Sequence, residues 1–179
     1  GDVFSAGWFS SKGEFGWICK GLSIPENREA IPTILRKYNT TLGLTCYSEI
    51  LADVPKVVDD LDAISKNHAF TFFSDGFPNQ DTNNIISLCK SLAPKLSTAM
   101  LVGYGNWYGR ELMADMAKSL GGVLVHSSNL DDFSKSYASF CSGAENLQPK
   151  VEFKVPTGAV RFITTVSENK EVITHSVDD

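Results

Sequence analysis

The chain has 179 residues and a net charge of -5, and 42% of its residues are hydrophobic and 21% charged. This composition is typical of a folded domain with a substantial core, and the acidic balance without a Lys/Arg stripe argues against binding to nucleic acid or to an anionic membrane surface. No apolar run approaches the roughly 20 residues that span a bilayer, and no signal peptide is visible.

The N-terminal segment is predicted to form a β-hairpin. Val3–Trp8 and Phe15–Leu22 are rich in β-forming residues, and the polar residues 10–13 between them are suited to a turn. Residues 25–27 then start a helix, because the apolar residues that follow recur at i, i+3, i+4 and i+7. These residues are Ile31, Ile34, Leu35 and Tyr38.

A second helix is expected after the Gly/Thr-rich turn at residues 39–45. Its broad apolar face runs from Ile50 to Ile64. Pro55 falls within this pattern, and because proline removes a helical hydrogen bond it should kink the helix or mark a late start.

Strands and helices alternate in the middle of the chain. The expected strands cover 69–73, 98–103 and 123–125, and the helices that follow them cover 82–92, 107–120 and 130–140. This order predicts an α/β fold with a doubly wound, mostly parallel, Rossmann-like sheet and an antiparallel edge hairpin. Ligands of such sheets bind beyond the carboxyl ends of the strands.

The pattern changes to strands alone after Gly143. Val151–Val155, Ala159–Val166 and Val172–Val177 are expected to be strands, the last two joined around residues 167–170. We therefore expect an α/β domain over 1–143 and a small C-terminal β extension over 144–179.

The cysteines indicate the compartment. Cys19, Cys46, Cys89 and Cys141 form no C-x-x-C pair, and no histidine lies near them in sequence, so a zinc or redox site has little support. We expect four reduced, buried thiols and an intracellular location, in the cytoplasm or within a viral particle. Because residue 1 is Gly rather than Met, we also expect the chain to be processed, tagged or cut from a longer one.

The loop "GYGNWYG", residues 103–109, lies between a strand and a helix, where a phosphate-binding loop would lie. Its spacing is G-x-G-x-x-x-G rather than G-x-G-x-x-G. A plain turn with Asn106 as the helix N-cap is the favoured interpretation, and a Rossmann-like nucleotide-binding enzyme is the alternative.

Thr45 and Asp75 are the candidate site residues. Thr45 precedes a helix, and Asp75 ends the strand that follows it. Asp75 could be an ordinary turn residue, because Asp-Gly followed by Pro-Asn is common turn chemistry. However, a hydroxyl and a carboxylate on neighbouring loops at one end of a parallel sheet are hard oxygen ligands suited to Mg²⁺.

The order of these parts resembles a von Willebrand factor A domain. "GDVFSAGWFSSKGEFGWICKGLSI" is similar to the family's second and third strands, "LGLTCYSEIL" to its Gly-Thr loop, and "TFFSDGFPN" to its strand that ends in Thr/Ser-Asp-Gly. "MLVGYGNWYGRELMADMAKSLGGVLVHSSNLDDFSKSYASF" is similar to its last two strand-helix units. The resemblance covers roughly residues 1 to 140.

The resemblance implies a divalent cation at a metal-ion-dependent adhesion site, completed by a carboxylate from a partner protein. Thr45 matches the family's threonine ligand, and Asp75 matches its aspartate. The family's Asp-x-Ser-x-Ser motif has no counterpart here, because it ends the family's first strand and this chain starts at the second.

The expected function is a non-enzymatic protein-binding or assembly module, with a Mg²⁺ site that is completed by residues outside this chain. In this family the first strand lies in the middle of the sheet, so we expect that strand to come from upstream in the same polypeptide or from a separate chain. The alternative from another class is a structural subunit of a large assembly, such as a virion, without a metal role.

Overall fold

The computed structural model describes residues 2–37, 43–145, 162–166 and 172–176. The chain forms two compact units, Gly1–Asn146 and Leu147–Asp179. The second unit contains an antiparallel pair of strands, β6 (Phe162–Val166) and β7 (Val172–Ser176). The strand expected over 151–155 lies outside the described residues.

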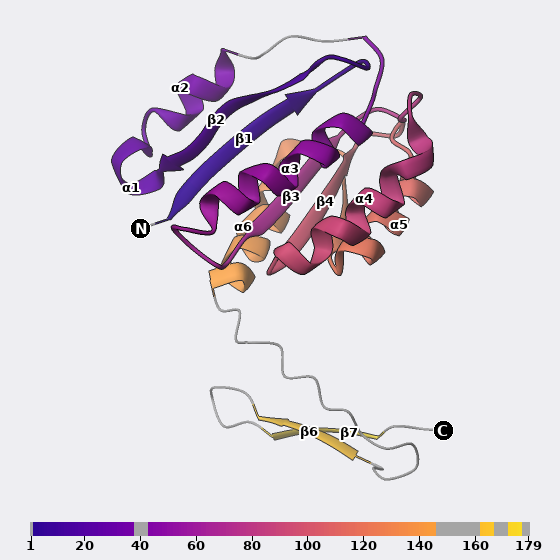
Figure 1. The fold of residues 1–179 in the computed structure, drawn as a ribbon. Helices are drawn as coiled ribbons and strands as arrows, with labels where there is room; N and C mark the ends of the chain where they lie inside the picture. The colour runs from indigo at the N-terminus through magenta and orange to yellow at the C-terminus, as the bar shows by residue number, and fades with distance from the viewer. Residues whose placement is uncertain (1, 38–42, 146–161, 167–171, 177–179) are drawn as a thin grey trace. The chain divides into compact units, whose positions relative to one another are not determined.

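A parallel sheet of the order β3-β4-β5 forms the centre of the first unit. Its strands are β3 (Ala69–Ser74), β4 (Thr98–Tyr104) and β5 (Val123–Ser127). Figure 1 shows α3, α4 and α5 in front of these strands and α6 behind them. The α/β class and the strand-helix alternation expected from the sequence are therefore confirmed.

The helices that accompany this sheet are close to those expected. They are α3 (Ser48–Leu61), α4 (Ile85–Leu92), α5 (Arg110–Leu120) and α6 (Leu130–Glu145), with short 3₁₀ turns η1 (Thr82–Asn84) and η2 (Ala93–Lys95) beside α4.

The N-terminal hairpin is confirmed, with β1 (Val3–Phe9) antiparallel to β2 (Phe15–Ser23). Its place differs from the expectation of an edge on one continuous sheet. Among the described strands, β1 and β2 form a sheet of their own, without a ladder to β3. Side chains rather than backbone bonds hold the two sheets together, since the Phe9 ring stacks on the Phe72 ring of β3 with centroids 5.0 Å apart.

The helix expected after the hairpin is divided in two, which corrects the prediction. α1 (Ile24–Asn27) ends before α2 (Ile31–Arg36) begins. Pro32 lies in the first turn of α2, where its missing N–H costs nothing, whereas in the interior of one long helix it would remove a hydrogen bond and clash with the preceding turn. Tyr38, which the prediction also used, lies outside the described residues.

α3 does not start late, because it runs from Ser48 through Pro55 to Leu61. A proline inside a helix costs about 3 kcal/mol. The helix forms nevertheless because one side of it is deeply buried, and burying each large aliphatic side chain contributes roughly 1.5–3 kcal/mol. The buried residues of α3 are Ser48, Ile50, Leu51, Val54, Val57 and Val58.

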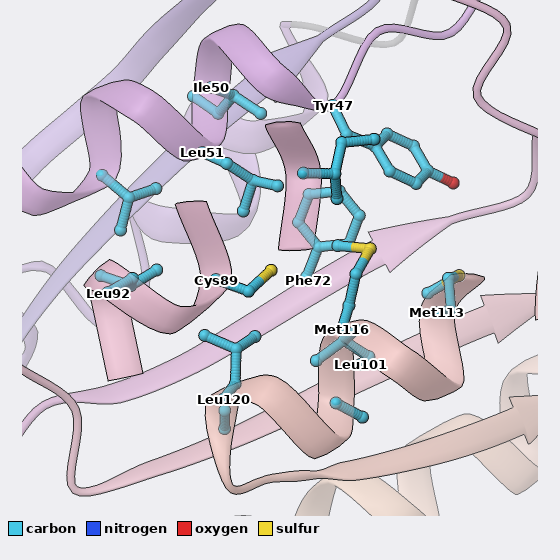
Figure 2. Close-up of a cluster of buried hydrophobic side chains, with 14 of the residues drawn as sticks. Tyr47, Ile50, Leu51, Phe72, Cys89, Leu92, Leu101, Met113, Met116 and Leu120 are labelled. Carbon is cyan, nitrogen blue, oxygen red and sulfur yellow. The ribbon is translucent and has the colours of Figure 1, made fainter. Parts of the chain in front are cut away.

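The core lies between the strands and the layer of α3, α4 and α5 (Figure 2). Cys89 of α4 and Met113 and Met116 of α5 are fully buried in it. Phe9, Phe15 and Trp17 of the hairpin pack against the same core. One core therefore joins the two sheets of the first unit.

Cys19, Cys46 and Cys89 are free thiols, and Cys46 and Cys89 are buried as expected. Cys19 is only half-buried, which differs from the expectation, and the side chain of Cys141 lies outside the described residues. Burial raises the pKa of the Cys89 thiol to about 11. Within the described part of the chain, no helix combines the length and the apolar character needed to cross a membrane.

Candidate functional site

Thr45 lies against Gly76, the residue that follows Asp75, just beyond the carboxyl end of β3. A Cβ atom on Gly76 would lie only 2.7 Å from Thr45 Oγ1. The threonine hydroxyl therefore lies directly against the Gly76 backbone. The sequence placed these residues on neighbouring loops, and the fold brings those loops into contact.

Backbone hydrogen bonds fix the two loops to each other. The Asn79 N–H donates to the Thr45 carbonyl oxygen at 3.0 Å, and the Thr45 N–H donates to Asn79 Oδ1 at 3.2 Å. Next to this pair, Cys46 and Gln80 form an isolated parallel bridge. Thr45 is thus held by its backbone, and its side-chain hydroxyl is not needed for that.

Buried Tyr47 forms hydrogen bonds to the same edge from the interior of the first unit. Its side chain is fully buried, and its hydroxyl donates to the Gly76 carbonyl oxygen at 2.7 Å and lies 2.9 Å from Ser74 Oγ. Burial raises the pKa of Tyr47 to about 12, with a smaller contribution from the negative charge of Asp75, while the Ser74 hydrogen bond acts in the opposite direction. Sequence reasoning gave no role to Tyr47.

The Asp75 side chain is exposed at this edge. Thr45 and Asp75 supply one hydroxyl and one carboxylate, which are hard oxygen donors of the kind that Mg²⁺ prefers. Within the described residues, no group of three or more His, Cys, Asp or Glu side chains is gathered in a form suited to a metal ion. The donor types of Thr45 and Asp75 fit a cation, and two such residues would supply only part of a ligand shell.

Two further acids lie nearby but have structural partners. Glu49 Oε2 accepts a hydrogen bond from the Gly13 N–H at 2.6 Å, and Asp81 lies 2.8 Å from the Lys12 ammonium group. These contacts attach the hairpin turn to α3 and to the loop after β3. Nothing in the local sequence indicated them, because the partners are more than 30 residues apart.

The loop at residues 103–109 does not have the predicted cap. α5 begins at Arg110, its N-cap is Gly109, and no side chain caps it, so Asn106 is not the N-cap. A Cβ on Gly103 would overlap the Tyr108 ring, and the Tyr108 hydroxyl lies 3.2 Å from His126 Nδ1. Packing of Tyr108 therefore accounts for the glycine at 103, and the nucleotide-binding alternative stays a prediction.

Three large apolar side chains are exposed on the loops at this end of the first unit. Leu44 is 50% exposed, Phe77 62% and Trp107 86%. Phe77 lies against Gly109, so it connects the loop after β3 to the loop that carries Trp107. We call these three residues the apolar rim. Phe77 could not be identified from sequence, because its exposure depends on how the two loops pack.

Comparison with known proteins adds no relative, since neither a protein-family model nor a curated protein matches this chain.

Proposed function

We propose that this chain is a non-enzymatic protein-binding module of the von Willebrand factor A type. Its binding face would be the carboxyl end of β3, with Thr45 and Asp75 as two ligands of Mg²⁺ and the remaining ligands from residues outside this chain. The observation that carries the proposal is the close approach of the Thr45 hydroxyl to Gly76, the residue that follows Asp75.

A cation at this place would act as a bridge. Bound Mg²⁺ keeps several waters and takes few protein ligands, so it can accept a carboxylate from a partner while Thr45 and Asp75 hold it on this side. Both loops are tied together by the Asn79 bonds to Thr45. Such a preorganised pair of ligands supports a binding role.

The apolar rim supports a protein as the partner. Aromatic side chains are enriched at the centres of protein interfaces, and exposed Phe77 and Trp107 beside the Asp75 loop would supply apolar contact around a polar centre. The same rim also favours a second candidate, a structural subunit that packs against its neighbours without metal.

Mg²⁺ titration of the complete natural protein tests the proposal. At a free Mg²⁺ concentration about 100-fold above Kd, binding should stabilise the folded state by roughly 2.7 kcal/mol, seen as a rise in Tm. Asp75→Ala should abolish the rise, and Thr45→Val should reduce it. Asp60→Ala, which removes an exposed acid of α3, is the matched control and should retain it.

The two candidates separate in the same experiment. A protein that gains no stability from Mg²⁺ and binds its neighbours equally well with Asp75→Ala is a structural subunit, and the cation proposal is then wrong.

A further inference from the structure

The strand β5 forms the edge of the parallel sheet on the side away from β3. Among the described strands it pairs only with β4, so one row of its backbone N–H and C=O groups lies outside the ladder. Exposed edges are commonly protected by charged residues or proline, whereas β5 has the sequence VLVHS and contains no lysine, acid or proline. Its first residue, Val123, is 54% exposed. This edge is therefore suited to pairing with a further strand.

An apolar groove lies beside this edge, between β5 and α6. Its apolar lining consists of Met100 of β4, Val123 and Val125 of β5 and Phe140 of α6, and its volume is about 480 Å³, which is within the range of ligand sites in proteins. Val123 and Val125 lie on one face of the sheet, because alternate residues of a strand share a face. Figure 1 shows α6 on that face, behind the strands. A strand added at the β5 edge would therefore have this groove beside its side chains.

Lys135 is the charged residue of the groove lining. Asp131 and Asp132 precede it on α6 by four and three residues, the spacing at which ion pairs form on a helix. Within the described part of the chain, however, Lys135 forms no ion pair with these or other acids. It lines the groove instead, together with Ser136 and Ser139. One unpaired cation and two hydroxyls beside an apolar floor are suited to a carboxylate that carries an apolar group.

The position of Lys135 decides the direction of such a ligand. α6 follows β5 after a short loop and packs back on the sheet, so it runs antiparallel to the strand. Lys135 is about 8 Å along α6 from its start, and Val125 is about 7 Å from the end of β5, so the two residues lie at a similar level. Phe140 lies further along α6, toward the amino end of β5. A carboxylate at Lys135 therefore has its apolar part on the side of Val123 and Phe140.

We propose that the β5 edge and this groove bind the C-terminal end of an extended partner peptide whose last residues are uncharged and apolar. The peptide adds parallel to β5 and forms backbone hydrogen bonds with its open edge, which is a common mode of peptide recognition. Its terminal carboxylate pairs with Lys135, and an apolar side chain near its end enters the groove beside Val123 and Phe140. A chain end fits better than an internal segment, because it supplies a carboxylate without a charged side chain in the apolar groove.

This peptide site is independent of the proposed cation. Its lining comes from β4, β5 and α6, and neither Thr45 nor Asp75 belongs to it. Binding of the peptide should therefore be the same in EDTA and in Mg²⁺, and failure of the cation proposal leaves the prediction for the peptide unchanged.

Fluorescence anisotropy with the 179-residue chain tests the inference. The probe is a labelled peptide of about six residues, the length of a typical strand, that alternates Thr and Val and ends in Leu with a free carboxylate. The matched control is the same peptide with a C-terminal amide. The free acid should bind about tenfold or more tightly than the amide, because the amide cannot form the charge-assisted hydrogen bond with Lys135.

Lys135→Met tests the protein side of the same contact, because it keeps the aliphatic chain and removes the ammonium group. It should weaken binding of the free acid by about tenfold or more and leave binding of the amide unchanged. Lys118→Met, at an exposed lysine of α5 outside the groove, is the control and should change neither. If the natural protein does not bind the free acid, or binds acid and amide equally, or if Lys135→Met binds the acid as the natural protein does, the inference is wrong.

Amide hydrogen exchange locates the bound peptide. At a peptide concentration about ten times Kd, exchange in β5 should slow by about tenfold, and a peptide with Pro at its centre should not have this effect. β2, an edge strand of the other sheet, is the internal control, and equal protection of β2 would show unspecific strand pairing and overturn the inference. Octanoate that binds as tightly as the peptide, without protection of β5, would identify a free apolar acid as the ligand and would overturn it too.

Discussion

Removing the hydroxyl of Tyr47 should weaken the edge that carries Thr45 and Asp75. In Tyr47→Phe the Gly76 carbonyl oxygen loses its 2.7 Å hydrogen bond, although the Ser74 hydroxyl at 3.2 Å remains as a donor. Because one partner is left, the cost is that of a single buried hydrogen bond rather than of an unsatisfied group, about 1 kcal/mol. The ring itself stays in place, so the packing against Phe9 and Phe72 is retained.

Alkaline pH should remove more stability from the natural protein than from this variant. Burial raises the pKa of Tyr47 from 10.0 to about 12, and the charge of Asp75 adds to the effect. Below pH 10 the phenol is neutral in both states, and its full contribution to stability is present. Between pH 10 and 12 the unfolded chain loses the proton first, so stability falls by roughly 3 kcal/mol in total.

Urea denaturation across this pH range, with tyrosinate absorbance as a second probe, measures the effect. The free energy of unfolding of Tyr47→Phe should start about 1 kcal/mol lower than that of the natural protein at neutral pH. It should then decline less above pH 10, so the two curves cross before pH 12. Phe77→Ala, which removes an exposed ring and no titrating group, is the control and should stay parallel to the natural protein. Parallel curves for Tyr47→Phe would refute the reasoning about its burial.

Further predictions concern the edge, the apolar rim and the core. Asp75→Asn should lower the pKa of Tyr47, because it removes the charge that helps to raise it, and tyrosinate absorbance should then rise at a lower pH. Phe77→Ala and Trp107→Ala should leave the free energy of unfolding within about 0.5 kcal/mol, yet weaken partner binding by about tenfold or more in a titration with the isolated partner. Met116→Ala, at a fully buried position, should lower the free energy of unfolding by about 2–5 kcal/mol in urea.

Sequence reasoning succeeded where the signal is local. The hairpin at the N-terminus and the strand-helix alternation are confirmed because turn residues and apolar periods are properties of short segments. The sequence also put Thr45 in the loop before a helix and Asp75 directly after a strand, and α3 and β3 have these bounds. Their role as ligands stays a prediction.

Sequence reasoning failed where long-range packing decides. Whether Pro55 kinks the second helix or delays its start was left open by the sequence, because no local rule for proline includes how much of the helix is buried, and the structure shows that α3 does not start late. The sequence also could not predict that β1-β2 and β3-β4-β5 are separate sheets. Which strands form hydrogen bonds to each other is determined by how all the strands of a layer are arranged, and no short segment encodes this. Tyr47 was missed because its partners lie 27 and 29 residues away.

The structure gives a different reason from the sequence for the glycine that follows Asp75. A glycine after Asp is usually explained by a turn that needs positive φ, but Gly76 is not among the residues with positive φ. Position 76 requires glycine for a steric reason instead, because a Cβ there would lie 2.7 Å from Thr45 Oγ1. An alanine at 76 must therefore displace the threonine hydroxyl or the Asp75 loop, although its backbone conformation is allowed. The glycine thus belongs to the candidate site, and Gly76→Ala should weaken any ligand that Thr45 and Asp75 hold together more than it weakens folding.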